Sequence, residues 1–161
     1  MLAAACGGGT AANPAVSPSQ SSCSGCVPAT GQLTFTGDVA GTMTLSSKSV
    51  CSRTPEHDPF ELVFYGTGLT TDVEPDKAMN GKEWVLVVDG TVSSPDGVDA
   101  GVGPTSLHVS IYLTHPGGIS HSSVTMARDM RSGSLDLHLK GDEVRQGGLT
   151  SVTGRYTCAF P

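Results

Sequence analysis

The sequence predicts an all-β fold, built as an antiparallel β-sandwich or a partly open barrel of about eight or nine strands. Three observations support this class. Glycine is abundant, with 21 residues, and threonine, serine and valine are frequent, a composition that favours short strands joined by tight turns. Several segments alternate apolar and polar residues with a period of two. No stretch carries a convincing helical period.

Eight segments show the strand pattern, with turn-forming residues between them. The clearest is residues 106–114, where Leu107, Val109, Ile111 and Leu113 alternate and are predicted to face inward. Residues 83–88 are apolar on both faces, which predicts a central strand with Trp84 in the core. The other segments are residues 32–36, 42–45 with a continuation or a short further strand at 50–51, 60–65, 123–126, 134–140 and 151–158.

Composition divides the chain into three parts. Residues 1–6 place three alanines before Cys6, as at the end of a lipoprotein signal peptide, which predicts that Cys6 is acylated. Because the basic and apolar parts of such a signal are missing, this interpretation expects a start codon upstream or a shortened chain; the alternative is an ordinary Ala/Gly-rich N-terminus. Residues 7–30 are predicted to be a disordered, flexible linker with a span of roughly 25 to 30 Å. Residues 31–161 are predicted to form the β-domain.

The chain has five cysteines, an odd number that leaves one unpaired in an oxidised protein. If Cys6 carries lipid, the other four form two pairs, and we predict the bridges Cys51–Cys158 and Cys23–Cys26. The first bridge would close a loop of about 107 residues and stabilise the fold by roughly 4 to 5 kcal/mol. Two alternatives stay open: a cytosolic protein with five free thiols, and a redox role for the Cys-x-x-Cys pair.

Two segments are candidates for a divalent metal. The first is a loop whose oxygen-bearing side chains follow the ligand spacing of calcium loops: Asp72, Glu74, Asp76, Asn80 and Glu83. Lys77 stands in this loop where a calcium loop needs glycine, so a solvated acidic loop is the alternative. The second is the pair His115 and His121 around a Pro-Gly-Gly turn, which would bind zinc if a carboxylate joined them; solvent-exposed histidines are the alternative. No cofactor is predicted.

The spacings that catalysis requires are missing from the sequence. There is no Gly-x-Ser-x-Gly nucleophile elbow and no phosphate-binding Gly-x-x-x-x-Gly-Lys-Ser/Thr loop. A net charge of −6 argues against binding to nucleic acid, which needs clustered lysine and arginine. We therefore expect a protein without enzymatic activity, with a hydrolase of unrecognised site as an alternative.

Outward-facing aromatic side chains are the best candidates for contact with a partner. Alternation places Tyr65 and Tyr112 on outer faces that are rich in threonine and serine, a combination suited to a carbohydrate or protein ligand. Ordinary surface tyrosines are the alternative. The same alternation places His108 and His138 towards solvent.

The chain resembles the small lipoprotein antigens of mycobacterial and related actinobacterial envelopes. The matching features are the Ala-Ala-Ala-Cys6-Gly-Gly start, the Ser/Pro-rich spacer, the opening strand from Gly31 to Phe35, and the closing Val-Thr-Gly-Arg-Tyr-Thr-Cys158. The resemblance implies a lipid-anchored β-domain whose early cysteine pairs with one near the C-terminus, where Cys51 and Cys158 stand. It implies no catalytic residues.

The leading hypothesis is a lipid-anchored, extracytoplasmic β-domain attached to the cell membrane. It would act as a non-enzymatic binding module of the cell envelope, with an unknown protein or glycan ligand. The alternatives are a secreted β-protein that binds calcium or zinc, and a hydrolase.

Overall fold

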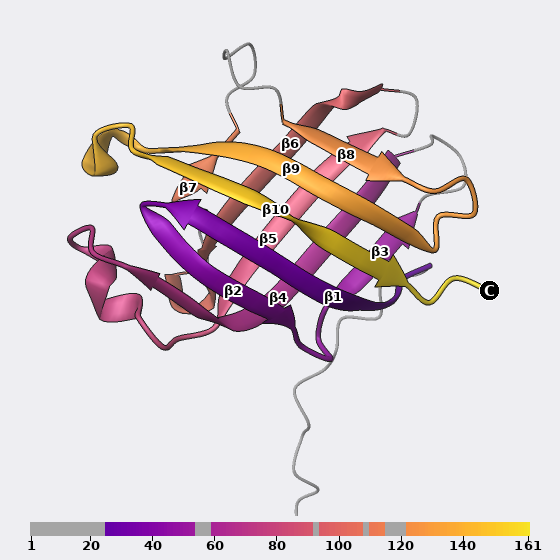
Figure 1. The fold of residues 1–161 in the computed structure, drawn as a ribbon, viewed down its shortest axis with the longest axis horizontal. Coiled ribbons are helices and arrows are strands. Elements are labelled where there is room, and N and C mark those ends of the chain that lie inside the picture. The colour runs from indigo at the N-terminus through magenta and orange to yellow at the C-terminus, as the bar shows by residue number, and fades with distance from the viewer. Residues whose placement is uncertain (1–24, 54–58, 92–93, 108–109, 115–121) are drawn as a thin grey trace, which may run out of the picture.

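The computed structural model of this chain describes residues 25–53, 59–91, 94–107, 110–114 and 122–161. Within them the chain forms ten β-strands in one antiparallel sheet and three short 3-10 helices (Figure 1). The strands are β1 (Val27–Gly37), β2 (Val39–Leu45), β3 (Val50–Arg53), β4 (Pro59–Thr71), β5 (Trp84–Thr91), β6 (Ser94–Pro104), β7 (Tyr112–Leu113), β8 (Ser123–Met126), β9 (Ser132–Gly141) and β10 (Leu149–Cys158). The 3-10 helices are η1 (Asp76–Met79), η2 (Thr105–Leu107) and η3 (Glu143–Arg145).

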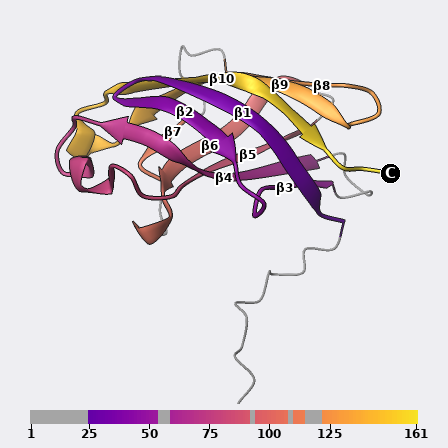
Figure 2. The ribbon, with the colours of Figure 1, turned by 60° about the horizontal axis from the view of Figure 1, so that its bottom comes forward.

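The sheet closes on itself, because β10 pairs with β1 along one edge and with β9 along the other. The order around the wall is β10, β1, β2, β4, β5, β6, β7 and β9, which makes a closed eight-stranded barrel. Figure 2 shows β1, β2, β9 and β10 on one side of the barrel, with β4, β5 and β6 on the other. The predicted antiparallel all-β fold is confirmed, and the barrel is closed.

The two remaining strands, β3 and β8, complete the wall at one end. β3 pairs with residues 27–28 of β1 and residues 60–63 of β4. Further along the same two strands, β2 pairs with residues 32–35 of β1 and residues 66–71 of β4. β8 pairs with residues 133–136 of β9, whereas β7 pairs with residues 140–141. The wall between β1 and β4, and the wall along β9, are therefore each built from two short strands.

The interior of the barrel is filled by side chains. Its largest fully buried members are Trp84, Tyr112, Tyr156, Phe35 and Phe64. An eight-stranded barrel is just wide enough for its own side chains or one small ligand, and here the side chains take the space.

Glycines make room for these large groups across the strands. Tyr156 lies between Gly31 of β1 and Gly133 of β9, which are its direct partners in the two ladders. A Cβ atom at Gly133 would stand 2.4 Å from the Tyr156 hydroxyl oxygen, so only glycine fits there. The reverse arrangement occurs at Gly154 of β10, a small residue that pairs with two large ones, Leu33 of β1 and Leu135 of β9. Such pairing of small with large residues packs a tapering interior.

One end of the barrel is closed by the disulfide between Cys51 of β3 and Cys158 of β10, which confirms the predicted pairing. The bridge joins residues 107 apart in sequence. For a loop of this size the chain-entropy estimate is about 4 to 5 kcal/mol of stabilisation. The last strand is thereby fixed to an early one.

Three expectations from the sequence are corrected. Residues 27–30, predicted as linker, belong to β1, because their backbone pairs with β3 and β10. β6 was not expected, since its segment is rich in glycine, aspartate and proline. Among the described residues of the predicted strand 106–114, Tyr112 and Leu113 form β7, while Ser106 and Leu107 belong to η2.

Ile111 is buried as predicted, but three other side-chain directions in the 106–114 segment are corrected. Tyr112, predicted to face outward, is fully buried, while Leu107 and Leu113 are 40% and 44% exposed. The segment does not run as one continuous strand, so alternation counted from Leu107 does not carry through to Tyr112. Tyr65 is half-buried and Trp84 lies in the core. His138 is exposed, as predicted.

Candidate functional site

The two ends of the barrel differ in the groups that they carry. The disulfide end holds Cys51, Cys158 and the start of β1. The opposite end, which we call the ion-pair end, holds η1, η3 and the turn between β1 and β2. The predicted calcium loop lies at the ion-pair end.

The structure does not gather the five predicted loop ligands around one point. Asp72 and Glu74 are exposed. The Asn80 side chain accepts a hydrogen bond of 2.7 Å from the Thr71 N–H and donates one of 3.1 Å to the Thr71 carbonyl. Glu83 pairs with Lys48 at 3.0 Å.

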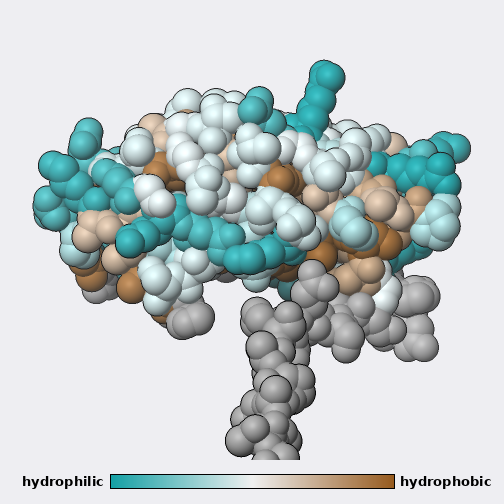
Figure 3. All heavy atoms as spheres, turned by 90° about the horizontal axis from the view of Figure 1, so that it is seen from below, coloured by the Kyte–Doolittle hydropathy of each residue, from teal (hydrophilic) through white to brown (hydrophobic). Residues whose placement is uncertain are grey.

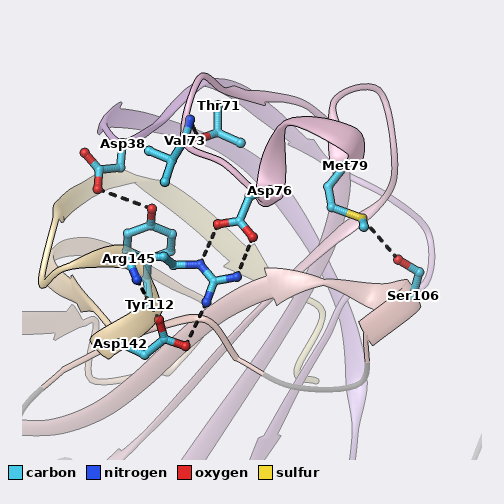
Figure 4. Close-up of polar contacts among 9 residues, drawn as sticks. All are labelled: Asp38, Thr71, Val73, Asp76, Met79, Ser106, Tyr112, Asp142 and Arg145. Atoms are coloured by element: carbon cyan, nitrogen blue, oxygen red, sulfur yellow. Dashed lines mark hydrogen bonds and ion pairs between the residues drawn. The ribbon is translucent and has the colours of Figure 1, made fainter.

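The fifth candidate, Asp76, binds arginine instead of a metal. Both of its carboxylate oxygens accept hydrogen bonds from the guanidinium of Arg145 (Figure 4). His115 and His121 lie outside the described residues. Within the described residues, no group of three or more His, Cys, Asp or Glu side chains is placed to hold a metal ion.

The Asp76–Arg145 ion pair is almost completely buried. The Asp76 side chain is 1% exposed and that of Arg145 is 6% exposed. A second carboxylate, Asp142, accepts a hydrogen bond of 2.7 Å from Arg145 Nη1 and is partly open to solvent. The bonds to Asp76 raise the pKa of Arg145 despite its burial. Burial opposes ionisation of Asp142, but the hydrogen bonds and charge of Arg145 outweigh it and lower the pKa of Asp142.

A second polar contact completes this end of the barrel. The buried Tyr112 hydroxyl donates a hydrogen bond of 3.3 Å to Asp38 Oδ2, in the turn between β1 and β2. Burial first, and then the negative charge of Asp38, raise the pKa of Tyr112. Asp76 and Arg145 thus join the β4–β5 loop to the β9–β10 loop, while Tyr112 joins β7 to the β1–β2 turn. The two contacts thus tie three connections and strand β7 together at this end of the barrel.

A serine, a histidine and an aspartate meet on the outer wall of β9 and β10. Ser151 Oγ lies 3.1 Å from His138 Nδ1, and His138 Nε2 lies 3.6 Å from Asp136 Oδ1. The composition is that of a hydrolytic triad, but the histidine and aspartate side chains are 44% and 60% exposed. β9 and β10 pair continuously here, so their backbone N–H groups serve the ladder and do not form an oxyanion hole. This cluster is a solvated polar contact.

The disulfide end carries a shallow hollow of about 750 Å³ on its outer wall. The hollow crosses β1, β10, β9 and β8, and its floor includes Gly31, Gly133, Met126 and Ala127. We call it the hydroxyl hollow, because its polar lining is Thr30, Thr125, Ser132, Ser134, Thr157 and one cation, Arg155.

The strand register sets these polar groups in two rows. Thr30, Thr157 and Ser132 face one another across β1, β10 and β9. Arg155 stands in the next row, between Gln32 on β1 and Ser134 on β9, with Thr125 of β8 beyond Ser134. Neighbouring strands lie about 4.8 Å apart, so four strands spread the row over about 14 Å.

The Tyr156 hydroxyl lies beneath Gly133 at the edge of this hollow. It has no hydrogen-bond partner among the described residues, although the side chain is 1% exposed. Burial raises the pKa of Tyr156. The phenol is therefore a neutral group that packs against Phe64, with ring centres 5.4 Å apart.

The remaining predicted site residues are cysteines. Cys6 and Cys23 lie outside the described residues, so neither the acylation of Cys6 nor the Cys23–Cys26 bridge is described. Cys26, which is described, is not free.

Sequence reasoning singled out Asp76, but as a calcium ligand, and it missed Arg145 and the ion pair between the two. Asp76 and Arg145 are 69 residues apart, and nothing in their local sequence links them. The outward positions of His138, Ser151 and Arg155 follow from strand alternation. Their neighbours depend on the register between strands, which one sequence does not supply.

Comparison with protein-family models, with curated proteins and with solved structures finds no match to this chain.

Proposed function

We propose that this chain is an extracytoplasmic, lipid-anchored β-barrel that acts as a non-enzymatic binding module of the cell envelope. The observation that carries the proposal is the filled interior, in which Trp84, Tyr112, Tyr156 and the core leucines leave the outer wall as the surface for a ligand. A module of this kind binds through side chains on the outside of its strands.

The disulfide supports the location. Bridges such as Cys51–Cys158 form and persist in secreted and surface proteins, and are rare where thiols are kept reduced. The structure describes no helix that is long and apolar enough to cross a membrane. A lipid on Cys6 would attach the barrel to the membrane through the spacer between Cys6 and the first strand.

The start of β1 at the disulfide end supports the anchored orientation. The chain enters the barrel at Val27, beside Cys51, so a tether ahead of this point pulls on the disulfide end. The side of the barrel in Figure 3 shows hydrophobic atoms in small separate patches among pale and hydrophilic ones, as suits a surface in water.

The anchor is tested by replacing Cys6 with serine in the protein expressed from its own gene. We expect the wild type to carry the mass of attached acyl chains and to enter the detergent phase, and Cys6→Ser to lose both properties. Thr10→Ala is the matched control and should retain them. Membrane attachment of Cys6→Ser without acylation would refute the anchor.

The absence of enzymatic activity is tested on the Ser151–His138 contact. We expect the wild type and Ser151→Ala to hydrolyse activated phenyl esters at the same low rate, because the contact is exposed and lacks an oxyanion site. A rate in the wild type that falls at least a hundredfold in Ser151→Ala would favour a hydrolase instead.

A further inference from the structure

The hydroxyl hollow presents groups that both donate and accept hydrogen bonds. Each threonine or serine hydroxyl offers one donor and two acceptor positions. The Thr30 and Thr157 hydroxyls, 2.7 Å apart, share one hydrogen bond and keep acceptor positions open. A ligand that matches such a surface carries many hydroxyl groups of its own, as a sugar does.

Arg155 adds one directed positive charge to the hollow. Its neighbours in the same row, Gln32 and Ser134, are neutral, and Arg155 forms no salt bridge among the residues that the structure describes. Asp136 lies two residues after Ser134 on β9, and its Oδ1 is 3.6 Å from His138 Nε2. In a chain of net charge −6, a guanidinium without a partner is a ready site for an anion. Its planar fork matches the two oxygens of a carboxylate.

The hollow is less suited to a peptide or protein. It lies on the face of a continuous ladder, so the paired backbone of β1, β10 and β9 offers no edge for an added strand. Protein interfaces are anchored by large apolar side chains, and the most exposed of these among the described residues, Val144 and Leu149, lie at the other end of the barrel.

The floor of the hollow suits the carbon face of a sugar ring. Gly31 and Gly133 line the hollow without a side chain of their own, and Met126 and Ala127 add apolar atoms to the same lining. Hydroxyl groups around the rim then face the ring substituents. Size agrees with this, since binding sites for small molecules commonly measure roughly 300 to 1,000 Å³.

We propose that the hydroxyl hollow binds a carboxylate-bearing oligosaccharide, with Arg155 holding the carboxylate and the surrounding threonines and serines holding the sugar hydroxyls. The proposal rests on the proposed function, because it names the ligand class of the binding module. Binding is reversible and involves no covalent step.

Calorimetric titration of the full chain with trigalacturonic acid tests the proposal, and the methyl ester of the same trisaccharide is the matched ligand. The ester keeps the ring hydroxyls and loses the negative charges. We expect the acid to bind, and the ester to bind about tenfold to hundredfold more weakly, which is the range for loss of a charge-assisted hydrogen bond.

The matched protein variants are Arg155→Ala and Arg53→Ala. Both arginines are exposed, but Arg53 lies on β3 and outside the hollow. We expect Arg155→Ala to weaken binding of the acid at least tenfold with an unchanged melting temperature, and Arg53→Ala to bind as the wild type does. Arg155→Lys should retain part of the affinity, since it keeps the charge and loses the fork.

Three results would overturn the proposal: no binding of the acid at millimolar concentration, equal binding of acid and ester, or equal effects of Arg155→Ala and Arg53→Ala. The last would mean that only general charge attraction is at work. If the chain is still acylated at Cys6 when one of these results is obtained, the ligand inference fails while the anchored module stands.

Discussion

Replacing Arg145 with methionine leaves Asp76 buried without its cation, and this is the most severe single change that the structure suggests. The Asp76 side chain is 1% exposed, so solvent cannot compensate for the missing partner. Breaking a buried pair by removing one member typically costs about 3 to 5 kcal/mol. With a urea slope of about 2 kcal/mol per molar, the unfolding midpoint at pH 7 should fall by roughly 2 M.

A double-mutant cycle separates the ion pair from simple packing. We expect Asp76→Leu and Arg145→Met each to be strongly destabilising, and the double variant to be no worse than either one, because no charge is then left buried. The coupling free energy should be at least about 2 kcal/mol. The control is the Lys48–Glu83 pair, whose side chains are 62% and 27% exposed, and Lys48→Met should cost less than about 1 kcal/mol.

Urea denaturation, followed by the fluorescence of Trp84, measures the free energy of unfolding of the wild type, the two single variants, the double variant and the Lys48→Met control. Additive losses in the double variant would refute the ion-pair explanation. A loss below about 1 kcal/mol for Arg145→Met would do the same, because it would mean that water reaches Asp76.

Three further predictions concern the carboxylate row, the packing at Gly133 and the disulfide. In the row Glu61–Asp89–Asp99, burial and then the two neighbouring carboxylates raise the pKa of Asp89 above its usual value of 3.8. Its ionised form therefore weakens the fold above that raised pKa, and the penalty disappears as the pH falls below about 3.8. Asp89→Asn should raise the free energy of unfolding by about 0.5 to 1 kcal/mol at pH 7 and leave it unchanged at pH 3, whereas Asp136→Asn should stabilise less; equal gains at both pH values would contradict the charge explanation. Gly133→Ala should lose about 1 to 3 kcal/mol, because its Cβ meets the Thr125 carbonyl and the Tyr156 ring, while Tyr156→Phe should keep or raise the melting temperature, since the hydroxyl has no partner among the described residues; a tolerated Gly133→Ala would count against the close packing. Cys51→Ser/Cys158→Ser should lose about 2 to 5 kcal/mol and make the melting temperature insensitive to reductant, and a wild type equally insensitive would contradict a stabilising bridge.

The pH dependence of the ion-pair end has the opposite sign to that of Asp89. The lowered pKa of Asp142 means that its contribution to stability is present above the unfolded value and is lost as the pH falls through the folded one. Lowering the pH therefore removes the stabilising contact of Asp142 with Arg145 in the β9–β10 loop. It also removes the destabilising repulsion among the carboxylates of Glu61, Asp89 and Asp99 on β4, β5 and β6.

Alternation predicted the strands whose inner faces carry large apolar residues. In β4, Leu62 and Phe64 face inward, as do Leu135, Leu137 and Leu139 in β9. These segments alternate cleanly because one face meets the core and the other meets water. The disulfide was predictable for a related reason, since Cys158 continues the inward row of Val152 and Tyr156.

β6 was not predictable by the same rule, because its small residues are set by neighbours that are remote in sequence. A Cβ at Gly101 would stand 2.5 Å from Ser110 Oγ and 2.8 Å from Leu113 Cδ2. The strand exists because β5 offers a complete ladder partner from Trp84 to Asp89. Pairing between strands thus outweighs the low strand propensity of a Gly-, Asp- and Pro-rich segment.

The same alternation that fills the barrel leaves the outer wall as the surface for the proposed ligand. Every second residue of β1, β9 and β10 is committed to the interior, and the glycines at 31, 133 and 154 are fixed there because an added Cβ would collide with the neighbouring strand. An enlarged cavity would need several of these pairs to change together, whereas an outer residue such as Arg155 is replaceable without disturbing the core. Affinity for a ligand is therefore free to vary on the outer wall at little cost in stability. For this reason the single substitution Arg155→Ala, which leaves the inner face untouched, is a fair test of whether the wall of this barrel binds an acidic sugar.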